Sequence, residues 1–142
     1  MKIGIGLWCL QSTATAPRSF TQAYQDLLND AQLAEEVGVH SLWLSEHHGY
    51  YDGYCPALLP AAAAALSVTT TLQVGTGVLL LPLQDPTRVR LATAELNARF
   101  DNRFHLGTGM GYRPSEFDAM DLAMADRVKR MNVGLDVLAV DP

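Results

Sequence analysis

One pattern recurs four times along the chain: a short run of strand-forming residues is followed by a longer run whose apolar residues have helical spacing. The predicted strands are residues 2–8, 41–45, 72–81 and 104–108. The 142 residues divided by four give about 35 residues per unit, the size of a βα repeat in a parallel α/β fold. Such folds are open doubly wound sheets or closed eight-stranded barrels, and a full barrel needs about 250 residues. The chain is long enough for half of one, with residues 1–142 as a single domain.

Capping residues place the helix boundaries. Ser19 followed by Gln22 fits a capping box, and Gly38 stands where that helix would end. The pair Asp85-Pro86 combines an N-cap residue with a proline at the first helical position, so a helix is expected to begin there. The predicted helices are residues 20–37, 57–67, 86–98 and 127–140.

Composition narrows the class of protein. Apolar residues make up 49% and charged residues 18% of the chain, which excludes disorder. The 10 Lys and Arg against 15 Asp and Glu give a formal charge of −5, which argues against nucleic acid or an anionic membrane surface as a partner. The longest apolar stretch, residues 57–68, is too short to span a bilayer, and no signal peptide is evident. Cys9 and Cys55 form no disulfide framework, so we expect a cytoplasmic protein with reduced thiols.

Candidate functional residues gather where the predicted strands end. Ligands of parallel α/β proteins bind at the carboxyl ends of the strands. Each of the four predicted strands contains, or is followed by, residues that could carry chemistry. They are Trp8 and Cys9, the triplet Glu46-His47-His48, the segment Gly75–Val78 and the segment Gly107–Arg113. Because these clusters share one edge of the predicted sheet, we expect them to form one site.

The adjacent histidines favour acid–base chemistry over metal binding. Neighbouring residues at a strand end point in opposite directions, so His47 and His48 cannot easily hold one ion. A single imidazole turned into the site can accept or donate a proton near neutral pH. A hydrogen-bonded loop histidine without a chemical role is the alternative. We expect His40 and His105 to be structural, and we expect no metal site.

Glycines in and after the last two predicted strands indicate a bulge or the close approach of a ligand. Gly75 and Gly77 interrupt an otherwise β-branched and leucine-rich strand. The segment GTGMGY lacks the third glycine of the dinucleotide fingerprint, which would fall at Tyr112. It instead predicts a tight turn, or a backbone against which a planar group can lie. We expect Arg103 at the solvated surface and Glu116 in a local cap or pair.

Three segments resemble the bacterial luciferase-like flavin-dependent oxidoreductases. They are LAEEVGVHSLWLSEHH at residues 33–48, LQVGTGVLLLPLQDPTRV at 72–89 and RFHLGTGMGYRPSEF at 103–117. The segments occur in the family's order and with family-like spacing, and the resemblance runs from residue 1 to about residue 140. It implies an α/β fold, a (β/α)₈ TIM barrel of which this chain is the N-terminal half-barrel with four βα units.

The resemblance also implies a cofactor and the residues around it. Members of the family bind reduced FMN, or in some cases the deazaflavin F420, at the carboxyl ends of the barrel strands. In the family, the first histidine of the EHH motif transfers a proton or stabilises the flavin intermediate, and that position is His47. We expect His47 to handle a proton and Glu46 to orient it. The flavin ring would pack against a cis peptide bond at Gly77–Val78. The resemblance places Gly77, Val78, Gly109, Met110 and Tyr112 beside the flavin. With Trp8, Gly75 and Gly107 from the predicted strand ends, these are the expected cofactor-binding residues.

The activity implied by the resemblance is that of a monooxygenase that uses reduced FMN and O₂ on a small organic substrate. An F420-dependent hydride-transfer oxidoreductase and a non-catalytic flavin-binding or assembly half-barrel are the alternatives. Relatives are about twice as long, as a full barrel requires. Open strand edges and an exposed interior therefore lead us to expect self-association or a separate chain that supplies the second half. Relatives often depend on a separate flavin reductase, which is a further expected partner.

Overall fold

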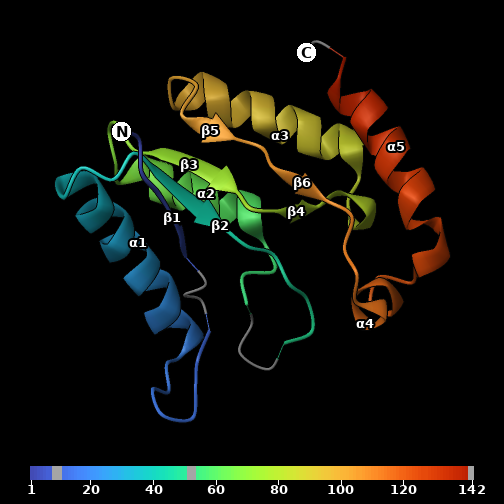
Figure 1. The fold of residues 1–142 in the computed structure, drawn as a ribbon, viewed down its shortest axis with the longest axis horizontal. Coiled ribbons are helices and arrows are strands. Elements are labelled where there is room, and N and C mark those ends of the chain that lie inside the picture. The colour runs from blue at the N-terminus through green and yellow to red at the C-terminus, as the bar shows by residue number, and fades with distance from the viewer. Residues whose placement is uncertain (8–10, 51–53, 141–142) are drawn as a thin grey trace.

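The computed structural model describes residues 1–7, 11–50 and 54–140 of the chain. Its main sheet has four parallel strands in the order β1-β2-β3-β5. These strands are β1 (Gly4–Leu7), β2 (Ser41–Leu44), β3 (Gln73–Thr76) and β5 (Phe104–His105). Two shorter strands, β4 (Leu79–Leu80) and β6 (Thr108–Gly109), pair in parallel with each other. The parallel α/β architecture predicted from the sequence is confirmed, and Figure 1 shows the strands running through the centre of the molecule.

The longer helices are α1 (Phe20–Glu36), α2 (Leu58–Ser67), α3 (Pro86–Arg99) and α5 (Arg127–Leu138). In Figure 1, α2 lies behind the sheet, with α1 and α3 on either side of it. The predicted caps are present: Ser19 accepts from the Gln22 N–H, and Asp85 accepts from the N–H groups of Thr87 and Arg88. The sequence analysis did not predict the short helix α4 (Pro114–Asp118) or the 3₁₀ turns η1 (Leu81–Leu83) and η2 (Met124–Asp126).

The single strand predicted over residues 72–81 is wrong, because the backbone changes partner in its middle. The Gly77 N–H donates to the Leu44 carbonyl of β2, whereas the Leu79 N–H donates to the Gly107 carbonyl. The peptide bond Gly77–Val78 between these two contacts is cis, as the resemblance implies. The hydroxyl of Ser45 donates to the Gly77 carbonyl at 3.0 Å. The strand predicted over residues 104–108 is likewise divided into β5 and β6.

The apolar core lies between the sheet and the helices. Because side chains alternate along a strand, Leu42 and Leu44 of β2 are buried in this core, whereas Trp43 lies over the opposite face of the sheet. The alanine-rich helix α2 contributes Ala62 and Ala65, which are fully buried. Small side chains allow α2 to lie close to the sheet, as its composition suggests.

The indole of Trp43 explains two of the strand glycines. A Cβ atom on Gly75 would collide with the six-membered ring of Trp43, and a Cβ on Gly4 would come within 3.0 Å of Nε1 of that indole. The ring of His105 lies 6.4 Å from Trp43, centroid to centroid, and its Nε2 is 2.8 Å from Oε1 of Gln73. Gly75 therefore makes room for a side chain of the protein itself, rather than for a ligand.

Arg103 is buried, which corrects the expectation that it lies at the solvated surface. Its guanidinium donates to the carbonyls of Leu66, Thr69 and Leu72, each at 3.0 Å. These carbonyls lie in and after the last turn of α2, where backbone acceptors lack helical partners. Arg103 therefore fastens the end of α2 to the start of β3.

Glu35 binds backbone N–H groups of the same loop, just as Arg103 binds its carbonyl groups. Its carboxylate accepts from the N–H groups of Thr70, Thr71 and Leu72 at 2.6–3.0 Å. Burial of the carboxyl alone would raise its pKa, but the hydrogen bonds from Thr71, Leu72 and Thr70 outweigh this and lower the pKa of Glu35 from 4.5 to about 2. The loop between α2 and β3 is thus held by one cationic and one anionic side chain.

Two strands of the main sheet have a single neighbour: β1 pairs with β2, and β5 pairs with β3. Over the described residues, both outer edges of this sheet therefore lack a partner strand, a situation that proteins usually avoid by covering or pairing the edge. None of the helices that the structure describes is both long enough and apolar enough to cross a membrane.

Candidate active site

A cavity of about 450 Å³ lies at the carboxyl ends of the strands. Its wall is formed by the segment after β2, by the link from β3 to β4, and by β6 with the turn that follows it. The lining residues are Ser45, Glu46, His47, Gly77, Val78, Leu80, Gly109, Met110, Gly111 and Tyr112. The structure therefore brings together, from three separate segments, most of the candidate residues that the sequence indicates.

Some candidate residues do not line this cavity. Gly75 lies beneath Trp43, as described above. A Cβ on Gly107 would collide with the carbonyl oxygen of Thr76, and its N–H donates to the Thr76 hydroxyl at 2.9 Å. Gly107 thus permits the link between β5 and β6 to pack closely against the end of β3. Trp8 and Cys9 lie outside the described residues.

The part of the wall formed by Val78 and the segment from Gly109 to Tyr112 is mostly bare backbone and apolar or aromatic side chains. A Cβ on Gly109 would collide with Cγ2 of Val78, so the main chain of β6 packs directly against that side chain. Val78 and Met110 are 39% and 40% exposed, and Tyr112 is 71% exposed. Three apolar or aromatic side chains therefore remain open to a ligand at this edge.

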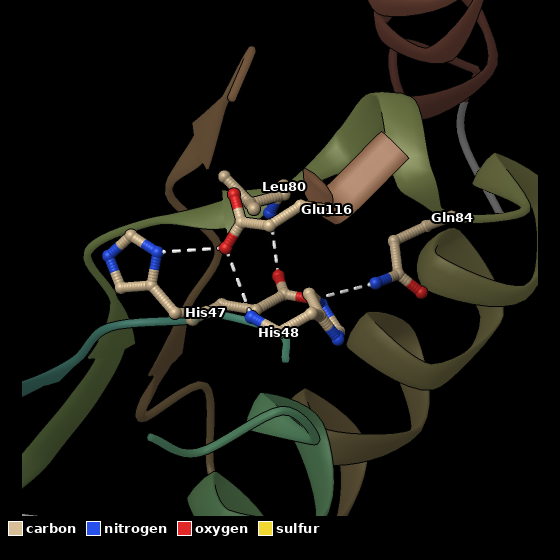
Figure 2. A network of polar contacts seen from close by, with 6 residues as sticks. His47, His48, Leu80, Gln84 and Glu116 are labelled. Carbon is tan, nitrogen blue, oxygen red and sulfur yellow. Dashed lines mark hydrogen bonds and ion pairs between the residues drawn. The ribbon is translucent and has the colours of Figure 1, made fainter. Parts of the chain in front are cut away.

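His47 is held by one ring nitrogen. Its Nδ1 lies 3.0 Å from Oε1 of Glu116, while within the described residues Nε2 has no hydrogen-bond partner. Figure 2 shows the ring with Nδ1 directed at the carboxylate and Nε2 on the opposite side. The side chain is 16% exposed and contacts the rings of Tyr54, Tyr50 and Tyr112, at 4.7, 5.3 and 6.4 Å between centroids. An imidazole held in this way offers Nε2 for proton exchange.

Glu46 does not orient His47, and that prediction is wrong. Its carboxylate accepts from the Leu80 N–H at 2.6 Å, from the Gln84 amide at 2.9 Å and from Nε2 of His48 at 2.6 Å. The hydrogen bond to Glu46 raises the pKa of His48 above its ordinary value of 6.5, although burial of the ring acts in the opposite direction. Glu46 and His48 therefore form a buried ion pair that joins the end of β2 to β4 and η1.

Glu116 is the residue of this site that the sequence did not indicate. It was expected in a local cap or pair, but its side chain is fully buried and reaches across 69 residues to His47. The same Oε1 atom also accepts from the backbone N–H of His48 at 3.0 Å. Pro114 at the start of α4 and the apolar Phe117 beside Glu116 are the available sequence signals for a buried turn here, yet neither names the partner.

Arg113 completes the surroundings of His47. Its guanidinium lies over the Tyr50 ring, 4.2 Å from the centroid, and one of its nitrogens, Nη1, is buried without a hydrogen-bond partner among the described residues. Within the residues that the structure describes, no group of three or more His, Cys, Asp or Glu side chains is arranged to hold a metal ion.

The chain matches the sequence profile of the family described as "Luciferase-like monooxygenase" over residues 1–138, and it belongs to that family. A curated relative, 4-hydroxyprotoasukamycin monooxygenase of Streptomyces nodosus subsp. asukaensis, is 35% identical over 117 residues, which are 79% of this chain and 31% of the relative. The resemblance stated from the three sequence segments is thereby confirmed.

Solved structures agree with this assignment. The monooxygenase RslO1 of Streptomyces bottropensis superimposes with a TM-score of 0.88 at 29% identity, over 97% of this chain and 42% of that one. The oxygenating constituent of 3,6-diketocamphane monooxygenase of Pseudomonas putida, solved in complex with FMN, gives a TM-score of 0.86 at 23% identity, over 97% and 38% of the two chains. The described sheet and helices are therefore part of a luciferase-like TIM barrel. The chain spans about a third of the length of the curated relatives it matches, so these relatives are longer than the twofold length that was expected.

Proposed function

We propose that this chain is the flavin-binding half of a luciferase-like monooxygenase, which uses reduced FMN and O₂ to oxidise a small organic substrate. The observation that carries this proposal is the position of His47. Its ring lines the cavity at the carboxyl ends of the strands, Glu116 holds Nδ1, and Nε2 has no partner in the described structure. An imidazole presented in this way beside an apolar wall can exchange a proton with a bound reactant.

The wall of the cavity fits the ring system of a flavin. Gly77, Gly109 and Gly111 leave backbone without side chains, and Val78 and Met110 offer apolar surface beside them. A planar aromatic ring system can lie against such a surface at van der Waals distance. These five residues would hold the ring of FMN.

The same wall is less suited to the phosphate of FMN. None of its described lining residues is a lysine or an arginine. A phosphate is held most strongly by the cationic side chains of Lys or Arg, which this part of the site does not offer. We propose that a second half-barrel supplies them, from another copy of this chain or from a separate chain, and that this half also covers the open edges of β1 and β5.

In this arrangement bound FMN supplies the electrons and the reaction with O₂. The residues of the chain move the proton, exclude water and hold the backbone in place. His47 takes or gives a proton at Nε2, Val78 and Met110 keep water from the ring, and the buried Glu46–His48 pair fixes the backbone that carries His47. Reduced FMN would reach the site from a separate flavin reductase.

Two other functions use the same cavity and are separated by experiment. An F420-dependent oxidoreductase would transfer a hydride without O₂, and a non-catalytic half-barrel would bind or assemble without turnover. Anaerobic titration with reduced FMN and with reduced F420, each followed by addition of O₂, distinguishes the three. The proposal expects binding of reduced FMN and, when O₂ and an oxidisable organic substrate are added, formation of oxidised substrate. Reoxidation of the flavin alone does not distinguish the three, because free reduced FMN also reacts with O₂.

The variant His47→Ala tests the role of the imidazole. We expect it to bind reduced FMN as the parent does and to lose turnover by about 100-fold or more, the usual contribution of a positioned proton donor or acceptor. His40→Ala is the matched control, because His40 precedes β2 and is therefore at the opposite end of that strand. Equal turnover in the parent and in His47→Ala would overturn this role.

The variant Met110→Trp tests the location of the cofactor. A tryptophan at this position fills the cavity, so we expect binding of reduced FMN to weaken by at least about tenfold. Leu91→Trp is the control, because Leu91 is 54% exposed on α3 and does not line the cavity. Unchanged binding in Met110→Trp would place the cofactor elsewhere.

A further inference from the structure

We infer that Glu116 is the positioning residue of the proposed site, which fixes His47 in the tautomer that carries its proton on Nδ1 and presents a bare Nε2 to the cavity. This inference rests on the proposed function, in which His47 exchanges a proton at Nε2.

The atom that faces Nδ1 of His47 is a carboxylate oxygen of Glu116. Nδ1 of His47 and the backbone N–H of His48 both lie 3.0 Å from Oε1 of Glu116. An ionised carboxylate only accepts hydrogen bonds, so the ring nitrogen that faces it must be the donor. When the ring is neutral, a proton on Nδ1 leaves the lone pair on Nε2.

Packing of the surrounding side chains holds the Glu116 carboxylate in place. Glu116 is 1% exposed, and its neighbour Phe117 is fully buried against Leu80 and Leu83. Helix α4 therefore cannot carry the carboxylate away from His47 without exposing an aromatic side chain. The two donors converge on one oxygen from consecutive residues, which fixes the backbone at position 48 and the ring at position 47 together.

No other carboxylate of the described site is available to replace Glu116 as the partner of His47. The other carboxylate of the site, Glu46, is already occupied by Leu80, Gln84 and His48. The second oxygen of Glu116, Oε2, is buried without a hydrogen-bond partner in the described structure, so both donors to this carboxylate come from the histidine pair. Each carboxylate thus binds a different imidazole: Glu116 binds His47, as Figure 2 shows, and Glu46 binds His48.

The direct test is the tautomer of His47, read from its ring nitrogens by NMR on protein labelled with ¹⁵N-histidine. Protonated and bare ring nitrogens resonate far apart, and the His47 signals are identified by their loss in His47→Ala. At a pH where the ring is neutral, we expect the parent protein to show a protonated Nδ1 and a bare Nε2. A protonated Nε2 in the parent would overturn the inference without any variant at position 116.

Variants at position 116 separate positioning from folding. Glu116→Gln keeps an oxygen in the place of Oε1, so we expect the Nδ1-protonated tautomer to persist. Glu116→Leu removes the acceptor, so we expect the ring to shift toward the Nε2-protonated form and turnover to fall by at least about tenfold with little change in KM. The control is Glu95→Gln, because Glu95 is an exposed residue of α3 that pairs with Arg99. An unchanged tautomer in folded Glu116→Leu would overturn the inference.

The same experiments keep this inference apart from the proposed function. The tautomer is measured without flavin, substrate or turnover. If the protein fails to bind reduced FMN while His47 shows the expected tautomer and its dependence on position 116, the proposed function fails and the positioning role stands. If FMN binds and turns over while the tautomer does not depend on Glu116, the positioning role fails alone.

Discussion

Replacement of Glu35 by glutamine should lower the stability of the fold in a way that depends on pH. The Glu35 carboxylate holds the backbone N–H groups of Thr70, Thr71 and Leu72, and its pKa is lowered from 4.5 to about 2. A depressed pKa means that the ionised group stabilises the folded state above the unfolded pKa, and that this contribution is lost as the pH falls toward the folded value. The window is therefore from about pH 4.5 down to about pH 2.

The size of the effect follows from the shift. A difference of about 2.5 pKa units, from 4.5 to about 2, corresponds to about 3.4 kcal/mol at about 1.36 kcal/mol per unit. The carboxylate is partly exposed, and solvent screening reduces this figure to about 1–2 kcal/mol. Glu35→Gln should lose that amount of unfolding free energy at neutral pH and progressively less below pH 4.5.

Urea denaturation at a series of pH values measures this difference. The matched control is Glu36→Gln, which removes the neighbouring, exposed carboxylate of the same helical turn and should change stability by less than about 0.5 kcal/mol. A gap between Glu35→Gln and the parent that stays constant from neutral to acidic pH would refute the electrostatic reasoning. Equal stability of Glu35→Gln and Glu36→Gln at neutral pH would refute it as well.

Two further substitutions test the packing of the strands. Arg103→Met should cost about 3 kcal/mol of unfolding free energy, because buried carbonyls lose a charged donor. Arg99→Met, which removes an exposed ion pair, should cost less than about 1 kcal/mol, and equal losses in the two would contradict the assignment. Gly109→Ala should cost about 1–3 kcal/mol, because its Cβ collides with Val78, and thermal denaturation that matches the parent would show that the two strands are not in contact.

Much of the fold could be predicted from the sequence, because its signals are local. The caps at Ser19 and Asp85 lie within a few residues of the helices they begin, and both are present. The prediction of a single strand over residues 72–81 was wrong, for a reason that is not local. Its apolar residues continue without interruption, but the partner of the backbone changes from β2 to β6 at Gly77, and sequence pattern carries no record of hydrogen-bond partners.

In the candidate site too, the features set by local sequence could be predicted, whereas the contacts between distant residues could not. The predicted strand ends placed His47 and Val78 at one edge of the sheet, because the carboxyl ends of parallel strands meet at the same edge. Both residues line the cavity there. The roles of the two carboxylates could not be predicted, because Glu46 is adjacent to His47 in sequence but bonds to His48, whereas Glu116 reaches His47 from 69 residues away. Gly75 was misinterpreted for a related reason, since the ring that needs its space belongs to Trp43 on the neighbouring strand.

The central claim is that the described half-barrel holds flavin when its open edges are covered. Size-exclusion chromatography with light scattering, after incubation with FMN and with flavin absorbance recorded on the same peak, tests this most directly. The account predicts a discrete dimer, or a complex with a chain that supplies the second half, whose peak carries flavin. A monomer that elutes without flavin would contradict it.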